Sequence, residues 1–261
     1  MKTCFKGEAP ASLQAYHCYN LRANWNDFKN ECQQGYKDVQ SQLQKDQGNL
    51  CCYCEIDTKL GFGIGKDDFR VEHFHPKSDA NQSNHNWALD WNNMLGCCHG
   101  GSDKHVTDCN NRYIQKSSER HSDVLKGDSI WDNEILNPLE IPAFPLLFQA
   151  NFRDGGLEVN ETNCLESGID IEKAKNCLHP NKLNLNSTQL KILRKATLDA
   201  LNKQLEEQLL GGIEIEDAIR NIVEAQLQKN DKQHWPPFFT TIRSFFGKSA
   251  EEYLVSINYI G

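Results

Sequence analysis

The chain has 261 residues, 38% of them hydrophobic, and a formal net charge of -8. Its length allows one large domain or two small ones. It contains no run near the roughly 18 apolar residues of a membrane helix, and its first twenty residues lack the apolar core of a signal peptide, so we expect a cytoplasmic protein without a membrane partner. The acidic balance argues against tight binding of nucleic acid by this chain alone, although not against catalysis on nucleic acid that a partner delivers.

The cysteine content indicates metal binding. Eleven cysteines in a chain expected to be cytoplasmic favour metal ligation over disulfides, and an odd number cannot all pair within one chain. Six of them lie between residues 51 and 109 and are considered below. The other five are interpreted as core or surface thiols: Cys4, Cys18, Cys32, Cys164 and Cys177.

Residues 1–48 are predicted to form an N-terminal helical lead-in. Apolar side chains recur there at three- and four-residue steps: Leu21, Trp25, Phe28 and Cys32, followed by Val39 and Leu43. We interpret residues 11–48 as a pair of scaffold helices that pack on the segment that follows.

Residues 49–126 have the cysteine spacing of a zinc-stapled ββα unit. Cys51 and Cys54 form a C-x-x-C pair, and Cys98 and Cys109 offer a second pair separated by the insertion HGGSDKHVTD. Four thiolates around zinc make a closed structural site, and a unit this small needs such a clip because it buries little core. The alternative is that several of these cysteines are simply buried thiols.

Two further cysteines lie next to the predicted ligands. Cys52 is expected to point away from the metal, which makes it the poorer ligand. Cys97 competes with Cys98 for the ligand role, and the sequence leaves that choice open.

The sequence DFRVEHFHP between the cysteine pairs predicts a strand that carries catalytic groups. Alternation places Phe69, Val71 and His73 on one face and Arg70, Glu72 and Phe74 on the other. Phosphodiester hydrolysis needs a base to activate water and a cation to hold the phosphate. His73 suits the base, and Glu72 is a hard oxygen ligand for Mg²⁺ or Mn²⁺.

Two asparagines and two basic residues complete the predicted site. Asn110 would begin a short helix and turn its side-chain carbonyl to the same ion, while Asn93 would hold the His73 strand through hydrogen bonds. His75 and Lys77 are candidates for contacts with the substrate phosphate. Alone, each has an ordinary explanation, such as helix capping by Asn110 or a solvated Lys77. Their order between the cysteine pairs favours the catalytic interpretation. Four residues stay unassigned: His85, His99, His105 and Asp103.

Residues 127–261 are predicted to form a hairpin followed by a helical region. FQANFRDGGLEVN indicates a hairpin turned at Asp154-Gly155. From Asn186, with Gln189 as its capping partner, a leucine stripe predicts a long helix that ends at Gly211-Gly212, and a second helix follows. The expected fold is therefore α+β and mostly helical, with N-terminal helices, a ββα core and a helical C-terminal half that serves packing or partner docking.

These motifs resemble those of a known family. The run Glu72–Lys77 reads E-H-x-x-P-K, Trp91–Leu95 reads WNNML, and Cys109 is followed at once by asparagine. This pattern resembles the HNH endonuclease superfamily, and more narrowly the PtuB-type HNH nucleases of Septu and retron anti-phage systems. The sequences ILNP at 135–138 and LNLN at 183–186 extend the resemblance over most of the chain.

The resemblance implies a role for each matching residue. His73 would be the general base, Glu72 and Asn110 would lie at the catalytic Mg²⁺ or Mn²⁺, and Asn93 would be the middle residue of the HNH pattern. The structural zinc would be held by Cys51, Cys54, Cys98 and Cys109. The implied partners are a PtuA-type ABC ATPase with SMC-like features and, in retron versions, the reverse transcriptase with its RNA-linked DNA.

The sequence thus predicts a metal-dependent HNH endonuclease, the toxic effector of an ATPase-coupled defence complex. One alternative is a non-catalytic zinc module that binds a protein partner in the same complex. A weaker one is a restriction nuclease that works alone, which would be expected to carry a basic DNA-reading domain. The choice between DNA and RNA as the substrate stays open.

Overall fold

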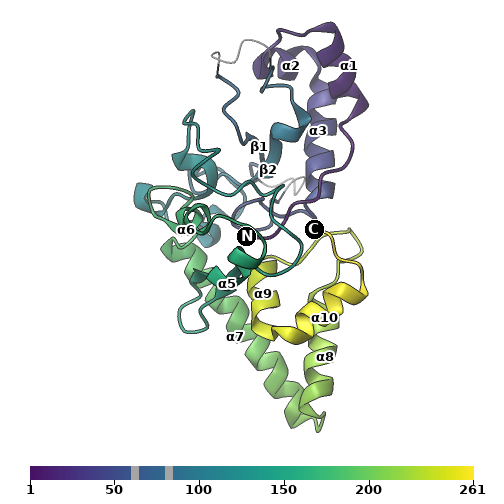
Figure 1. Cartoon of the computed structure of the whole chain (residues 1–261), viewed down its shortest axis with the longest axis vertical. Helices are drawn as coiled ribbons and strands as arrows, with labels where there is room; N and C mark the ends of the chain where they lie inside the picture. Colours follow the sequence, from purple (N-terminus) through teal and green to yellow (C-terminus); the bar gives the residue numbers. More distant parts are fainter. Residues whose placement is uncertain (60–64, 80–84) are drawn as a thin grey trace.

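The computed structural model describes residues 1–59, 65–79 and 85–261. Within this part of the chain the protein is mostly helical, with two small two-stranded antiparallel sheets (Figure 1). This confirms the predicted α+β class. None of the helices in the described ranges is both long and apolar enough to cross a membrane.

The N-terminal region forms three helices instead of the predicted two. They are α1 (Ala11–Tyr19), α2 (Trp25–Glu31) and α3 (Gln33–Asp46). Asn24 and Asp27 form a capping box at the start of α2, which explains why the chain turns there. Leu21 was predicted to lie on the apolar stripe, but it is 69% exposed because it falls in the turn between α1 and α2.

The next elements follow a strand–strand–helix order. Strands β1 (Arg70–His73) and β2 (Met94–Cys97) pair so that Glu72 lies opposite Leu95 and His73 opposite Met94. The 3-10 helix η1 (Trp91–Asn93) leads into β2. The short helix α4 (Cys109–Arg112) follows, and then the 3-10 helices η2 (Ser117–Glu119) and η3 (Ser122–Leu125).

The predicted hairpin is present as β3 (Phe148–Ala150) and β4 (Leu157–Val159). Its turn needs glycine at residue 155, because φ there is +75° and an added Cβ would lie 2.2 Å from the Lys191 carbonyl oxygen. Helices α5 (Glu161–Glu166) and α6 (Ile171–Leu178) follow it.

The C-terminal helices are α7 (Thr188–Leu210), α8 (Ile215–Gln226), α9 (Phe239–Phe246) and α10 (Lys248–Ser256), with α7 and α8 forming a long hairpin (Figure 1). The predicted end of α7 at Gly211 is confirmed. The predicted capping by Asn186 is wrong. Ser187 is the N-cap, and the Asn186 side chain instead bonds the backbone N–H and carbonyl of Leu157.

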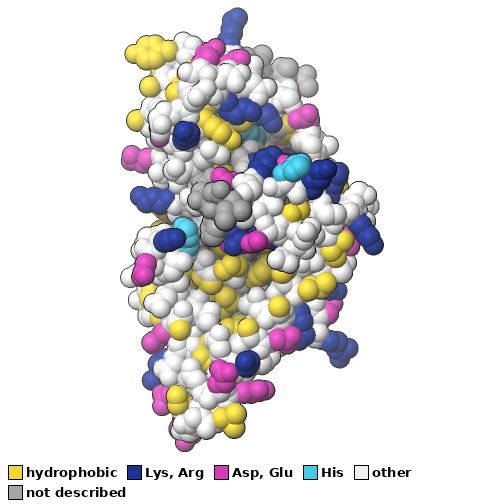
Figure 2. Space-filling model, turned by 180° about the vertical axis from the view of Figure 1, so that it is seen from behind, with side chains coloured by type: hydrophobic (Ala, Val, Ile, Leu, Met, Phe, Trp, Pro, Cys, Tyr) yellow, Lys and Arg dark blue, Asp and Glu magenta, His cyan; other side chains and the backbone are white. Residues whose placement is uncertain are grey.

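Buried side chains connect the ββα region to the elements on both sides of it. One apolar cluster joins Cys51, Cys54 and Leu95 to residues of the C-terminal half such as Phe148 and Leu190. Another joins α2 and α3 to Phe69 and Met94. The surface mixes charges of both signs, and Lys and Arg side chains gather around a histidine on one part of it (Figure 2).

Candidate functional site

Three of the four predicted zinc ligands lie together. The thiol sulfurs of Cys51, Cys54 and Cys98 all lie within 4.8 Å of one another, and all three side chains are buried. The sulfur atoms of Cys54 and Cys98 are 3.6 Å apart. A tetrahedral zinc site with Zn–S bonds of about 2.3 Å has sulfurs about 3.8 Å apart, so this group has the spacing of a zinc site.

A second thiol group shares Cys51 with the first. It contains Cys51, Cys52 and Cys97, and the sulfurs of Cys51 and Cys97 are 3.7 Å apart. Cys52, which we expected to point away from the other thiols, therefore faces them. Cys97 also donates a hydrogen bond to Asp123 Oδ1 at 3.0 Å, whereas Cys98 lies against Cys54. Because only the first group joins both cysteines of the C-x-x-C pair, it is the better zinc site.

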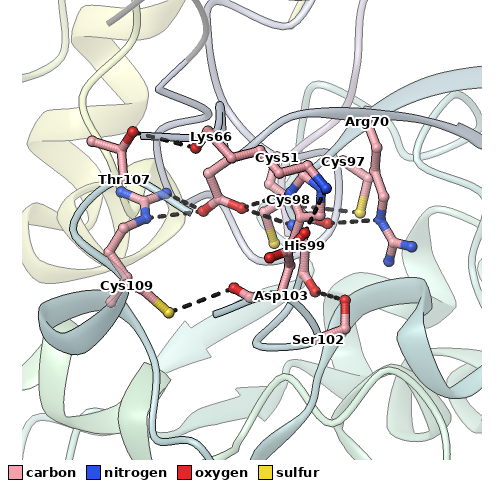
Figure 3. Close-up of polar contacts among 12 residues, drawn as sticks. Cys51, Lys66, Arg70, Cys97, Cys98, His99, Ser102, Asp103, Thr107 and Cys109 are labelled. Carbon is pink, nitrogen blue, oxygen red and sulfur yellow. Dashed lines mark hydrogen bonds and ion pairs between the residues drawn. The ribbon is translucent and has the colours of Figure 1, made fainter. Parts of the chain in front are cut away.

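Cys109, the fourth predicted ligand, belongs to neither thiol group. Its sulfur points toward Asp103, while Cys51, Cys97 and Cys98 lie together on the other side of the view in Figure 3. It donates to the Asp103 carbonyl at 3.5 Å and accepts from Gln115 Nε2 at 3.1 Å. The insertion before α4 thus holds Cys109 apart from the other three thiols.

The thiol cluster favours a thiolate at Cys51. Burial opposes ionisation there, but hydrogen bonds from the four neighbouring thiols outweigh it and lower the pKa of Cys51 well below its usual value. Burial raises the pKa of Cys54 and of Cys97, and their thiol neighbours add to that effect. A bound cation would favour the thiolate at every ligand, because it replaces protons with positive charge.

The two predicted catalytic residues of β1 point to opposite faces of the sheet, as neighbours in a strand must. The Glu72 face meets a buried ionic network. Lys126 donates to Glu72 Oε1, to the His73 carbonyl at 2.6 Å and to the Phe74 carbonyl at 2.8 Å. Burial and the nearby Asp123 carboxylate raise the pKa of Glu72 well above its usual value, although Lys126 acts against this.

The His73 face meets the N-terminal helices. His73 is 4% exposed, and the Trp25 ring lies edge-on at 4.9 Å between ring centroids. Its Nε2 lies 3.1 Å from the Ala88 carbonyl oxygen. A carbonyl can only accept, so the neutral ring carries its proton on Nε2 and leaves Nδ1 as the basic nitrogen. Burial, helped by the Lys77 charge, lowers the pKa of His73 to about 3, so the ring is neutral at neutral pH.

Asn93 holds the backbone that follows β1. Its Oδ1 accepts from His75 N at 2.7 Å, and its Nδ2 donates to the carbonyls of His75 and Trp87, each at 2.9 Å. Its own carbonyl accepts from Phe74 N at 2.9 Å. These four bonds fix the course of the chain directly after His73.

His75 and Lys77, the predicted phosphate contacts, have different surroundings. The His75 ring lies between two carboxylates, with Nδ1 2.7 Å from Asp132 Oδ2 and Nε2 3.0 Å from Asp79 Oδ2, and it stacks on Trp87. Both ring nitrogens are therefore already engaged. Lys77 is exposed. Asn110 is also exposed, on the first turn of α4, and no contact links it to Glu72 or His73 within the described residues.

The structure also shows two buried ionic groups that sequence reasoning missed. One is the Lys126–Glu72 pair with Asp123, which also accepts from Arg70 Nη2 at 2.5 Å. The other joins Asp68 to Arg112 and lies between β1 and α4. No spacing pattern links these residues, because each pair is more than 40 positions apart in sequence and meets only through the fold.

The chain is 30% identical over 253 residues to the predicted HNH endonuclease of retron Ec83 from Escherichia coli, and the match covers 93% of this chain and 92% of that protein. No protein-family model matches the chain. Identity at this level over nearly the full length of both chains shows their relationship. The protein belongs to the retron HNH endonuclease family, which confirms the resemblance seen in its motifs.

Proposed function

We propose that this protein is an HNH endonuclease that hydrolyses nucleic-acid phosphodiester bonds, as the toxic effector of a retron anti-phage system. The observation that carries the proposal is the full-length relationship to the HNH endonuclease of retron Ec83, together with Glu72, His73, Asn93 and Asn110 in the order of the HNH motif. We further propose that the protein acts in the cytoplasm with an ABC-type ATPase and with the reverse transcriptase and its RNA-linked DNA.

In this proposal His73 is the general base. The Ala88 carbonyl orients its ring and leaves Nδ1 unprotonated, so that Nδ1 accepts the proton of the water that attacks phosphorus. Asn93 acts as a positioning residue, because its side chain bonds the backbone of His75 and Trp87 and so holds the chain that follows His73. The edge of Trp25 packs against the ring, so substrate access to His73 requires this side chain to move.

A structural zinc ion suits the first thiol group. Cys51, Cys54 and Cys98 would hold it, and we propose Cys109 as the fourth ligand on the family pattern alone. The ion would supply folding energy and no chemistry, because a site closed by four thiolates has no open position.

The family also implies a catalytic Mg²⁺ or Mn²⁺ at Glu72 and Asn110. The positions of these residues do not fit such an ion. Lys126 donates to the Glu72 carboxylate, and within the described residues Asn110 makes no contact with Glu72. We therefore propose dependence on a divalent cation from the family relationship and derive no step through the ion.

The test is nuclease activity of the purified chain with Mg²⁺ or Mn²⁺ on duplex DNA, single-stranded DNA and total RNA, alone and with the neighbouring ATPase. We expect His73→Ala to lower the rate by about 10²- to 10⁴-fold, the usual contribution of a general base. His179→Ala is the matched control, since His179 is exposed and is not one of the predicted site residues. Equal rates for the two variants would rule out His73 as the base.

A non-catalytic zinc module is the second candidate function. The pairing of Glu72 with Lys126 and the burial of His73 favour it, because neither group is open to substrate in this arrangement. This alternative predicts that the protein binds zinc and its partners but cleaves no nucleic acid under any of these conditions.

A further inference from the structure

A basic hollow lies beside α4, formed by the two chain segments that flank this helix. Its volume is about 400 Å³. The insertion before α4 provides one wall and the segment after α4 provides the other. Among the described residues, the charged or titratable side chains that line it are Lys104, His105, Lys116, Arg120 and the single acid Asp103.

The cations of this hollow have no carboxylate partner among residues 1–59, 65–79 and 85–261. Lys104, Lys116 and Arg120 are exposed, and none of them forms an ion pair within the described parts of the chain. The carboxylate of Asp103 is engaged by Lys66 Nζ at 2.5 Å and by the His105 backbone N–H at 2.9 Å. Three cations that pair with no carboxylate of the described residues thus line one hollow in a chain whose net charge is -8.

The walls of the hollow are held in place before any ligand binds. The first wall is held by Lys66, whose backbone N–H donates to the His105 carbonyl at 2.9 Å and whose own carbonyl accepts from the Thr107 N–H at 2.9 Å. The second wall is tied to the C-terminal half. Asn184 Nδ2 donates to the carbonyls of Ser118 and Arg120, at 3.1 and 2.9 Å, and the Glu119 carboxylate accepts from the first residue of α7. Glu119 is therefore turned away from the cations.

We propose that this hollow binds the phosphate backbone of a polynucleotide through Lys104, Lys116 and Arg120, beside the helix that carries Asn110. The inference rests on the proposed nuclease function and adds a binding surface to it. An open hollow with several separate cations suits a chain of phosphates better than a small ligand, which needs an enclosed and mostly apolar pocket. Cations on exposed side chains position a backbone and read no bases, so the site is expected to be indifferent to sequence.

The test measures binding and not cleavage. The full chain is titrated, without added Mg²⁺ or Mn²⁺, into labelled single-stranded DNA, duplex DNA and single-stranded RNA at several salt concentrations. We expect the triple variant Lys104→Ala, Lys116→Ala, Arg120→Ala to bind at least about tenfold more weakly. Its slope of log affinity against log salt should be smaller by about 2 to 3, as the loss of three phosphate contacts requires.

The matched control is Arg153→Ala, Lys203→Ala, Lys248→Ala, which removes the same residue types and charge from exposed positions elsewhere. It should change affinity by less than about twofold, because distant surface charges are screened. Unchanged melting temperatures for both triple variants would show that each is folded. Equal weakening in the two triple variants, or no polynucleotide binding by the natural chain, would overturn the proposal.

Two further experiments distinguish a single-phosphate site from a backbone site, and this inference from the proposed nuclease function. Inorganic phosphate is added as a competitor at matched ionic strength. If it displaces the labelled strand as well as an unlabelled oligonucleotide of equal phosphate content, the hollow is a single-phosphate site and the backbone assignment is wrong. A chain that binds through the three cations but never cleaves would contradict the proposed nuclease function and leave this inference standing. Cleavage that depends on His73 but not on these cations would do the reverse.

Discussion

At the residue scale, Asp68 makes a dense set of polar contacts beside the candidate site. It is fully buried, its Oδ1 accepts from His99 N at 2.7 Å, and its Oδ2 accepts from the Nε and Nη2 atoms of Arg112 at 2.9 and 2.6 Å and from the Tyr113 hydroxyl at 2.5 Å. Arg112 also binds Asp57 Oδ1 at 2.6 Å. This network joins α4 to the segment that leads into β1, so it sets where Asn110 lies.

We predict that Asp68→Asn destabilises the protein by about 3 kcal/mol at neutral pH, because it removes the fully buried carboxylate of the pair and leaves the Arg112 charge with Asp57 alone. The measurement is urea unfolding. Asp128→Asn, at an exposed position with no ion pair in the described chain, should change stability by less than about 0.5 kcal/mol.

The stability loss caused by Asp68→Asn should depend on pH. Burial opposes ionisation of Asp68, but its hydrogen bonds with His99 and the charge of Arg112 outweigh this and lower its pKa below the usual value. A carboxyl whose folded pKa is lowered stabilises the fold above its unfolded pKa of about 3.9, and this stabilisation is lost as the pH falls through the folded pKa. The stability gap between natural protein and Asp68→Asn should therefore be full at pH 7 and shrink below about pH 4. A gap that stays constant over this range would contradict this account.

The buried pair of Lys126 and Glu72 gives a second prediction at this scale. Lys126→Met should destabilise by about 3 to 5 kcal/mol, because it leaves a carboxylate buried without its cation. Adding Glu72→Gln should recover part of that loss, since the amide is neutral. Urea unfolding of the single and double variants forms a double-mutant cycle, and additive effects would show that the two side chains are not coupled.

At the element scale, two adjacent cysteines at the end of β2 have different surroundings. The first thiol group contains Cys98, whereas Cys97 donates to Asp123. We predict that Cys98→Ser, like Cys54→Ser, loses most bound zinc and that Cys97→Ser keeps it. Zinc content of the purified proteins is the measurement, with Cys52→Ser as a control from the second group. Retention of zinc by Cys98→Ser together with its loss from Cys97→Ser would instead assign the site to Cys51, Cys52 and Cys97.

How far the sequence could predict these elements depends on whether a signal is local. Alternation in DFRVEHFHP correctly predicted which side chains share a face of β1, because Phe69 and Val71 pack together with the N-terminal helices and Phe74 packs on the other side with the cysteines. The hairpin at Gly155 and the end of α7 could likewise be predicted, because each depends on residues that are neighbours in the sequence. The partner of Glu72 could not be predicted in this way, because Lys126 is 54 positions away and reaches it only after the chain has folded back.

At the scale of the whole molecule, the C-x-x-C pair packs in one core with residues from distant parts of the chain. Cys51 and Cys54 lie in one cluster with Phe148, Leu190 and other residues beyond 127. Glu55, next to the knuckle, accepts from the backbone N–H and hydroxyl of Thr240 on α9, at 2.8 and 2.5 Å. We propose residues 1–48, 49–126 and 127–261 as functional units, but these contacts indicate that they fold together.

The final prediction concerns a fragment of residues 49–126. Expressed alone, it should be unfolded even with zinc, because its apolar face would be left in water and a metal clip cannot replace a missing core. The whole chain should instead unfold in one cooperative transition that far-UV circular dichroism and tryptophan fluorescence report with the same midpoint. Chelation of zinc should lower that midpoint for the entire molecule and not melt a part of it. Separate transitions, or a folded fragment with dispersed amide resonances, would show that the ββα unit is an independent domain with its own core.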